Sequence, residues 1–122
     1  MARVTSVELD GEEVRVVVYR GRCSGSPCFI LAYVYRGVPR LLLVPSPASP
    51  FCMRARLSRR EARLVEEALL HTYRAVMSYR LPVCRIPRSL LKESLAETLD
   101  HLKSLGVVDE VLADDAGRGE TV

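Results

Sequence analysis

Five arginines fall within ten residues of this 122-residue chain and are its clearest candidates for chemistry: Arg54, Arg56, Arg59, Arg60 and Arg63. They straddle the predicted start of a helix at Ser58. The helix dipole disfavours exposed cations there by roughly 0.3–1 kcal/mol each. Free amides and flanking arginines are, however, suited to phosphate, because the guanidinium fork matches phosphate oxygens. We therefore predict a nucleic-acid-binding site formed by these five residues.

Nearby carboxylates account for only part of this charge. Arg63 can pair with Glu66 or Glu67 one turn along the predicted helix, whereas Arg59 and Arg60 have no obvious local partner. A second basic group is expected at the far end of that helix, and it consists of Arg80, Arg85 and Arg88.

Charge is unevenly distributed along the chain. The net charge is −3 over residues 1–13, +12 over residues 14–92 and −6 over residues 93–122, which gives +3 in total. Such asymmetry favours an anionic partner, DNA or RNA. The competing interpretation is a solvated face paired with the acidic C-terminal segment. The chain has 16 arginines, two lysines, no asparagine and no glutamine, which is typical of a GC-rich, heat-adapted organism, and we expect a hyperthermophile.

The four cysteines suggest one disulfide. Cys23 and Cys28 bracket a turn at residues 24–27, and a hairpin there would place them directly opposite each other at bridging distance. Two inert thiols are the alternative to this disulfide. Intracellular proteins of hyperthermophiles retain such bridges. Cys52 and Cys84 lie beyond opposite ends of the long predicted helix, so no bridge between them is expected. No metal site is predicted, because half of a four-ligand set is missing.

Signals for catalysis are weak. His71 and His101 lack the nucleophile or ligand partner that a triad or a metal site requires. Gly21, Gly25 and Gly37 are placed for turns and form no phosphate-binding loop. We predict no catalytic residue and no cofactor, and favour a protein that is not an enzyme.

The first part of the chain predicts an antiparallel β-meander over residues 2–45. Asp10-Gly11 is a strong two-residue hairpin signal, and Arg36-Gly37 is a weaker one. One sheet face is then expected to carry Val14, Val16, Val18, Leu31, Tyr33 and Leu42 among others, and the other face to carry Val17, Ile30, Leu41 and Leu43 among others. The cross-strand pairs expected from these turns are Val18 with Tyr33 and Val16 with Tyr35.

The third and fourth strands are apolar on both faces, as buried strands usually are. Helices are expected on one face, and a second subunit is the candidate for the other. Phe29, Tyr33 and Tyr35 are better explained by core packing than by stacking on bases.

Two long helices follow, over residues 58–80 and 87–105. Ser58 and Glu61 match a capping box, in which each side chain bonds the other's amide. Pro87 suits the first position of the second helix, and Gly106 suits its end. Residues 107–112 fit either a fifth strand or a helical extension.

The predicted fold is therefore α+β: a single domain over residues 1–112, with a four- to five-stranded antiparallel meander and two long helices packed on one face. Residues 113–122 are predicted to be a loose acidic tail. The predicted core is centred on Val16, Val18, Leu31, Tyr33, Leu42, Val65, Leu69, Tyr73, Leu95 and Leu99.

Three functions remain open. The first is a nucleic-acid-binding accessory protein. The second is a homo-oligomeric protein–protein interaction module, a homodimer through the second sheet face. The third is a small enzyme without a recognisable motif. Residues 1–15 alternate polar and apolar residues and no apolar run is long enough to span a bilayer, so we expect no membrane association and a cytoplasmic location.

Overall fold

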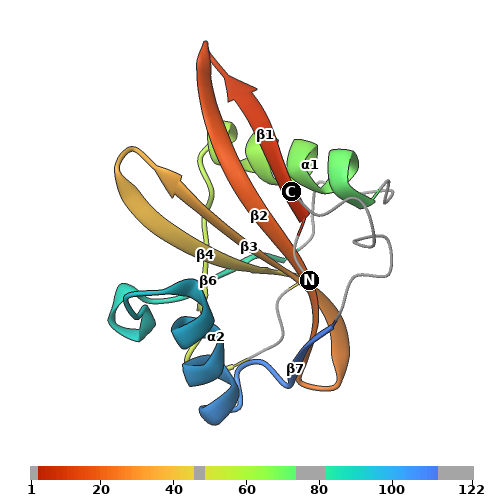
Figure 1. The fold of residues 1–122 in the computed structure, drawn as a ribbon, viewed down its shortest axis with the longest axis vertical. Helices are drawn as coiled ribbons and strands as arrows, with labels where there is room; N and C mark the ends of the chain where they lie inside the picture. The colour runs from red at the N-terminus through yellow and green to blue at the C-terminus, as the bar shows by residue number, and fades with distance from the viewer. Residues whose placement is uncertain (1–2, 46–48, 74–81, 113–122) are drawn as a thin grey trace.

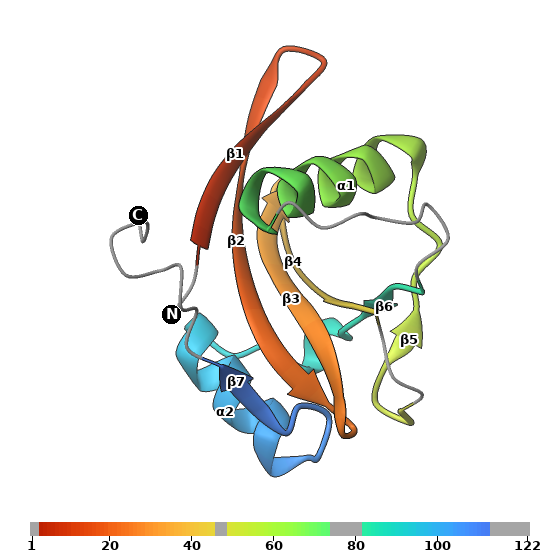
Figure 2. The ribbon, with the colours of Figure 1, turned by 90° about the vertical axis from the view of Figure 1, so that its right-hand side faces the viewer.

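One twisted antiparallel sheet organises the chain, with a helix on each of its faces (Figures 1 and 2). A computed structural model describes residues 3–45, 49–73 and 82–112. The strands run in the order β1-β2-β3-β4-β6-β5, and β7 pairs with β2. Their bounds are β1 Arg3–Leu9, β2 Glu12–Cys23, β3 Ser26–Tyr35, β4 Val38–Val44, β5 Met53–Arg54, β6 Cys84–Arg85 and β7 Glu110–Leu112. The helices are α1 Arg59–Tyr73 and α2 Leu95–Ser104, preceded by a short 3₁₀ turn, η1, at Arg88–Leu90.

Three tight turns create the predicted meander from β1 to β4. Each turn is a pair with positive φ at both positions: Asp10-Gly11 (50° and 83°), Ser24-Gly25 (52° and 80°) and Arg36-Gly37 (53° and 76°). Two consecutive positive φ angles match the right-handed twist of the flanking strands. Glycine adopts them without steric cost, which explains its place in each pair.

The predicted register of β2 against β3 is wrong by two residues. Val16 lies opposite Tyr33 and Val18 lies opposite Leu31, because the turn contains two residues, not four. The predicted faces are nevertheless correct, since a shift by two residues leaves every side chain on the same face.

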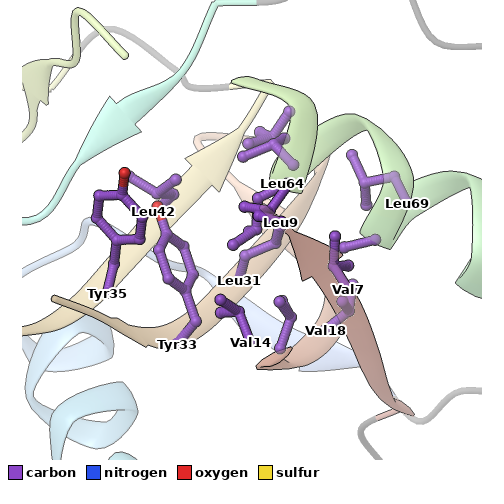
Figure 3. Close-up of a cluster of buried hydrophobic side chains, with 14 residues drawn as sticks. Val7, Leu9, Val14, Val18, Leu31, Tyr33, Tyr35, Leu42, Leu64 and Leu69 are labelled. Atoms are coloured by element: carbon purple, nitrogen blue, oxygen red, sulfur yellow. The ribbon is translucent and has the colours of Figure 1, made fainter. Parts of the chain in front are cut away.

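The first sheet face carries a core covered by α1. Its buried side chains are Val7, Leu9, Val14, Val16, Val18, Leu31, Tyr33, Tyr35, Leu42, Val44, Leu64, Val65, Ala68 and Leu69. Figure 3 shows the strand residues of this cluster beside Leu64 and Leu69 of the helix. Most of the predicted core lies here. The side chain of Tyr73 is outside the described residues.

The second face carries a separate core, so the prediction that both helices pack on one face is not confirmed. Its buried residues are Cys23, Cys28, Ile30, Leu41, Leu43, Cys84, Ile86, Leu99, Leu102, Val107 and Val108. The chain reaches this face because β6 pairs with β4 and the Ile86 N–H donates to the Leu41 carbonyl at 2.9 Å. α2 therefore covers the face that the sequence assigned to a second subunit, on the opposite side of the sheet from α1 (Figure 2).

The second predicted helix, residues 87–105, is divided. Leu91 is extended (ψ 137°) after η1, and α2 begins only at Leu95. Ser94 caps it, since the Ser94 hydroxyl accepts from the Glu97 N–H at 3.1 Å. That Ser94–Glu97 pair is a helix-start signal the prediction overlooked. Gly106 follows the helix with φ 76°, as its predicted terminating role requires.

Residues 110–112 resolve the ambiguity in the last segment, because they form β7 against Arg20–Arg22 of β2. The Asp109 carboxylate also accepts from the Gly25 N–H at 2.6 Å, which fastens β7 to the β2–β3 turn. The predicted continuation of the first helix over residues 74–80 and the predicted acidic tail lie outside the described residues. No helix in the described ranges is long and apolar enough to cross a membrane.

Candidate nucleic-acid interface

A buried carboxylate lies where α1 begins. Glu61 is 5% exposed, and its N–H donates to Ser58 Oγ at 3.1 Å, which is half of the predicted capping box. Its carboxylate contacts the sheet: Arg85 Nη2 lies 3.3 Å from Oε1, and Arg40 Nε lies 3.5 Å from Oε2. Two cations against one buried anion connect the start of α1 to β4 and β6. Sequence reasoning assigned Glu61 to the cap and missed this role.

The position of Arg85 corrects the prediction that placed it at the far end of the first helix. β6 pairs with β4 on one side and β5 on the other, with Arg85 opposite both Leu42 and Met53. Leu42 belongs to the core under α1, so Arg85 projects onto the same face and reaches Glu61. The chain after the helix thus brings a cation back to the helix start.

The tyrosines of β3 complete the inner part of this region. Tyr33 is 4% exposed and its hydroxyl donates to Glu61 Oε2 at 3.4 Å. Burial, and secondarily the charge of Glu61, raises the pKa of Tyr33 far above its ordinary value. Tyr35 is 6% exposed, and Phe29 packs against the same core. These rings support the sheet and offer no stacking surface, as the sequence favoured.

Further arginines surround the buried tyrosines. The guanidinium carbons of Arg36 and Arg40 lie 5.3 and 5.6 Å from the centre of the Tyr35 ring. Arg60 pairs with Asp10 of the β1–β2 turn, with 2.5 Å between Nη2 and Oδ2. Hydrogen bonds to Asp10 and Tyr35 raise the pKa of Arg60. Arg60 therefore has a partner that is distant in sequence, which local reasoning did not find.

The other four arginines of the predicted site differ in whether they have an acidic partner. Arg63 pairs with Glu67 at 3.3 Å, one of its two predicted partners. Arg54, Arg56 and Arg59 are exposed, and in the described part of the chain none of them has an acidic partner.

These three arginines do not all project from one face. Arg54 lies opposite Cys84, whose side chain belongs to the second core, so Arg54 projects away from Glu61. Ala55 and Leu57 pack on the first core, and Arg56 lies between them in the sequence. The segment that carries these charges runs from β5, at the outer edge of the sheet, to the first turn of α1 (Figure 2).

Both cysteine pairs are close enough to be bridged. Cys23 and Cys28 form the predicted disulfide, with Cα atoms 5.9 Å apart, but diagonally, since Cys23 faces Ser26. Cys52 and Cys84 also lie at disulfide distance, with Cα atoms 5.6 Å apart, which contradicts the prediction. The antiparallel pairing of β5 with β6 brings these two cysteines together. The prediction missed this contact because it considered only the length of the helix between them.

A pocket lies on the second sheet face, between the strands and the segment before α2. This pocket has a volume of about 530 Å³ and its walls include Arg15, Val17, Ala32, Val34, Leu41, Leu91, Leu95 and Thr98. Val34 is 58% exposed at its rim.

In the described ranges, no group of three or more His, Cys, Asp or Glu side chains is arranged to hold a metal ion. His71 lies exposed on α1 and His101 lies half-buried on α2, on opposite sides of the sheet. Comparisons with protein-family models, with curated proteins and with solved structures find no match to this chain.

Proposed function

We propose that this protein is a small nucleic-acid-binding accessory protein that contacts the phosphate backbone with arginines around the start of α1. One observation carries the proposal: Arg54, Arg56 and Arg59 are exposed within six residues and lack an acidic partner among the described residues. Arginines used only for stability would be expected to pair with carboxylates, as Arg60 and Arg63 do. Unpaired guanidinium groups are available to phosphate oxygens.

The surroundings favour an anion. Glu61 is buried and contacted by two arginines, so its negative charge is compensated within the fold. Arg36 adds positive charge beside Tyr35. Contacts of this type recognise the backbone and carry no base sequence. The expected binding is therefore independent of sequence and strongly dependent on salt.

The test is fluorescence anisotropy with short single- and double-stranded DNA and RNA at low salt. The variant replaces Arg54, Arg56 and Arg59 with alanine. A matched control replaces the exposed cations Arg15, Arg88 and Lys103, which removes the same charge elsewhere. We expect the first variant to lose most of its affinity and the control to retain it. Equal losses in both would mean that only the total charge matters, and would remove the site from the proposal.

Folding should survive the test substitutions. Arg59 lies in the first turn of α1, where a cation is disfavoured by the helix dipole. Its removal should leave the melting temperature unchanged or slightly higher. An unaltered melt would separate lost binding from lost structure.

The second candidate function is a homo-oligomeric interaction module, and the pocket beside Val34 supports it. α2 already covers Ile30, Leu41 and Leu43, so a second copy would contact only the uncovered part of that face. Solution mass by light scattering tests this candidate. A dimer that Val34→Asp converts to monomers would support it, whereas a monomeric wild-type protein would exclude it. The third possibility is a small enzyme. We assign a catalytic role to no residue of the described ranges.

A further inference from the structure

Two exposed apolar side chains lie in the chain segment that carries the first arginines of the proposed binding surface. The large hydrophobic side chains exposed in the described ranges are Val34, Phe51, Met53 and Leu70. Phe51 is 39% exposed and Met53 is 60% exposed. Phe51 lies three residues before Arg54, and Met53 three before Arg56, at the edge of the sheet formed by β5. Met53 lies opposite Arg85 and Arg54 opposite Cys84, so the two side chains project to opposite sides of this edge. Single exposed apolar residues are ordinary, but two of them on a sheet edge that also carries unpaired cations are a combination suited to a ligand with both apolar and anionic parts.

The fold holds this segment, which we call the edge segment (residues 51–56), in a defined position. Cys52, between Phe51 and Met53, lies at disulfide distance from Cys84. The N–H groups of Phe51 and Cys52 donate to the hydroxyl and the carbonyl of Ser49, both at 3.2 Å. Farther along, the Ala55 N–H donates to the Val83 carbonyl at 2.9 Å. The exposure of Phe51 and Met53 is thus built into an anchored strand edge.

From this arrangement we infer that Phe51 and Met53 contact nucleobases, and that the site binds single-stranded DNA or RNA in preference to a duplex. The inference rests on the proposed function and specifies its ligand. Each base of a single strand exposes a flat apolar face as well as its phosphate, which matches an edge strand that presents an apolar side chain on one side and an arginine on the other. In a duplex the base faces are stacked against one another and cannot reach an edge strand.

The buried rings of β3 strengthen the assignment. Tyr33 and Tyr35 are 4% and 6% exposed, so they cannot act as stacking platforms. Phe51 is then the exposed aromatic ring nearest in sequence to the unpaired arginines. Stacking of a base on an aromatic side chain contributes about 1–3 kcal/mol, equivalent to about a 5- to 150-fold change in affinity.

The experiment measures the affinity of the full chain for three labelled probes by fluorescence anisotropy. The probes are a 12-nucleotide single strand, the corresponding duplex, and a 12-nucleotide strand of abasic sites that keeps the phosphates and lacks bases. The variants are Phe51→Ala, Phe51→Leu and Met53→Ala. Leu70→Ala is the control, because Leu70 is 44% exposed on α1, away from the edge segment.

We expect Phe51→Ala to bind the single strand about 5- to 150-fold more weakly and to bind the abasic strand and the duplex as wild type does. Phe51→Leu and Met53→Ala should each show a smaller loss on the single strand, and Leu70→Ala should show none. An equal affinity of wild type and Phe51→Ala for the single strand, or an equal loss on the abasic strand, would overturn the base contact. If the variant lacking Arg54, Arg56 and Arg59 still lost affinity in that case, the proposed function would stand without the base contact. Absence of wild-type binding to every probe at low salt would overturn both.

Discussion

Replacing Glu61 with glutamine tests whether the buried carboxylate holds the start of α1 on the sheet. Glutamine keeps the shape of the side chain and removes its charge, which leaves Arg40 and Arg85 facing each other without an anion. Breaking a buried ion pair on one side typically costs 3–5 kcal/mol. The arginine side chains retain 21% and 31% exposure, so water screens part of the remaining charge. We expect a loss of about 3 kcal/mol, or roughly 10–15 °C in melting temperature.

The assay is chemical and thermal unfolding followed by circular dichroism, with Glu67→Gln as the control. Glu67 makes an exposed pair with Arg63, so its loss should change stability by about 0.5 kcal/mol or less. In the double variant Glu61→Gln, Arg85→Gln the loss should be smaller than the sum of the two single losses, because removing Arg85 relieves an uncompensated charge. A Glu61→Gln protein that melted within 2 °C of wild type (about 0.5 kcal/mol) would refute the conclusion that the Glu61 carboxylate, contacted by Arg40 and Arg85, holds the start of α1 on the sheet.

Two further predictions concern pH and redox state. The pKa of Tyr33 is raised in the folded protein, so the stability that its neutral form provides is complete below its ordinary pKa of 10.0 and is lost as the pH rises above that value. Wild type should therefore lose up to about 1.4 kcal/mol per pH unit above pH 10 relative to Tyr33→Phe, and parallel stability curves in urea titrations from pH 8 to 11.5 would contradict this. A Cys52–Cys84 bridge would span 32 residues and the Cys23–Cys28 bridge spans five, so preventing the first should cost about 4 kcal/mol and removing the second about 2 kcal/mol. The losses are measured by unfolding two double variants, Cys52→Ser with Cys84→Ser and Cys23→Ser with Cys28→Ser. A larger loss of stability in the second double variant would contradict this prediction.

Local sequence signals predicted the meander well. Asp10-Gly11 and Arg36-Gly37 fix two of its turns, since few other residue pairs accept two positive φ angles. Alternation assigned the strand residues to the correct faces even where the register was wrong. These features depend on neighbours in sequence, and the sequence therefore contains them.

Contacts between residues that are distant in the sequence were not predicted. Two-residue strands such as β5 and β6 have no periodicity to detect, yet their pairing brings Cys52 to Cys84 and Arg85 to Glu61. The chain that passes through β6 also leads to α2 on the second sheet face. The arginine cluster was visible in the sequence, but which of its members already have partners depends on contacts such as Arg60 with Asp10, fifty residues apart.

The salt dependence of binding tests the central proposal most directly. For wild type and for the variant lacking Arg54, Arg56 and Arg59, the affinity for a 12-nucleotide single strand is measured from 25 to 300 mM salt. Each phosphate neutralised contributes about 0.7 to the slope of log affinity against log salt concentration. If all three arginines contact phosphates, the slope should become shallower by about 2 in the variant. Identical slopes, or no wild-type binding at the lowest salt, would contradict the proposal that these arginines form a nucleic-acid-binding surface.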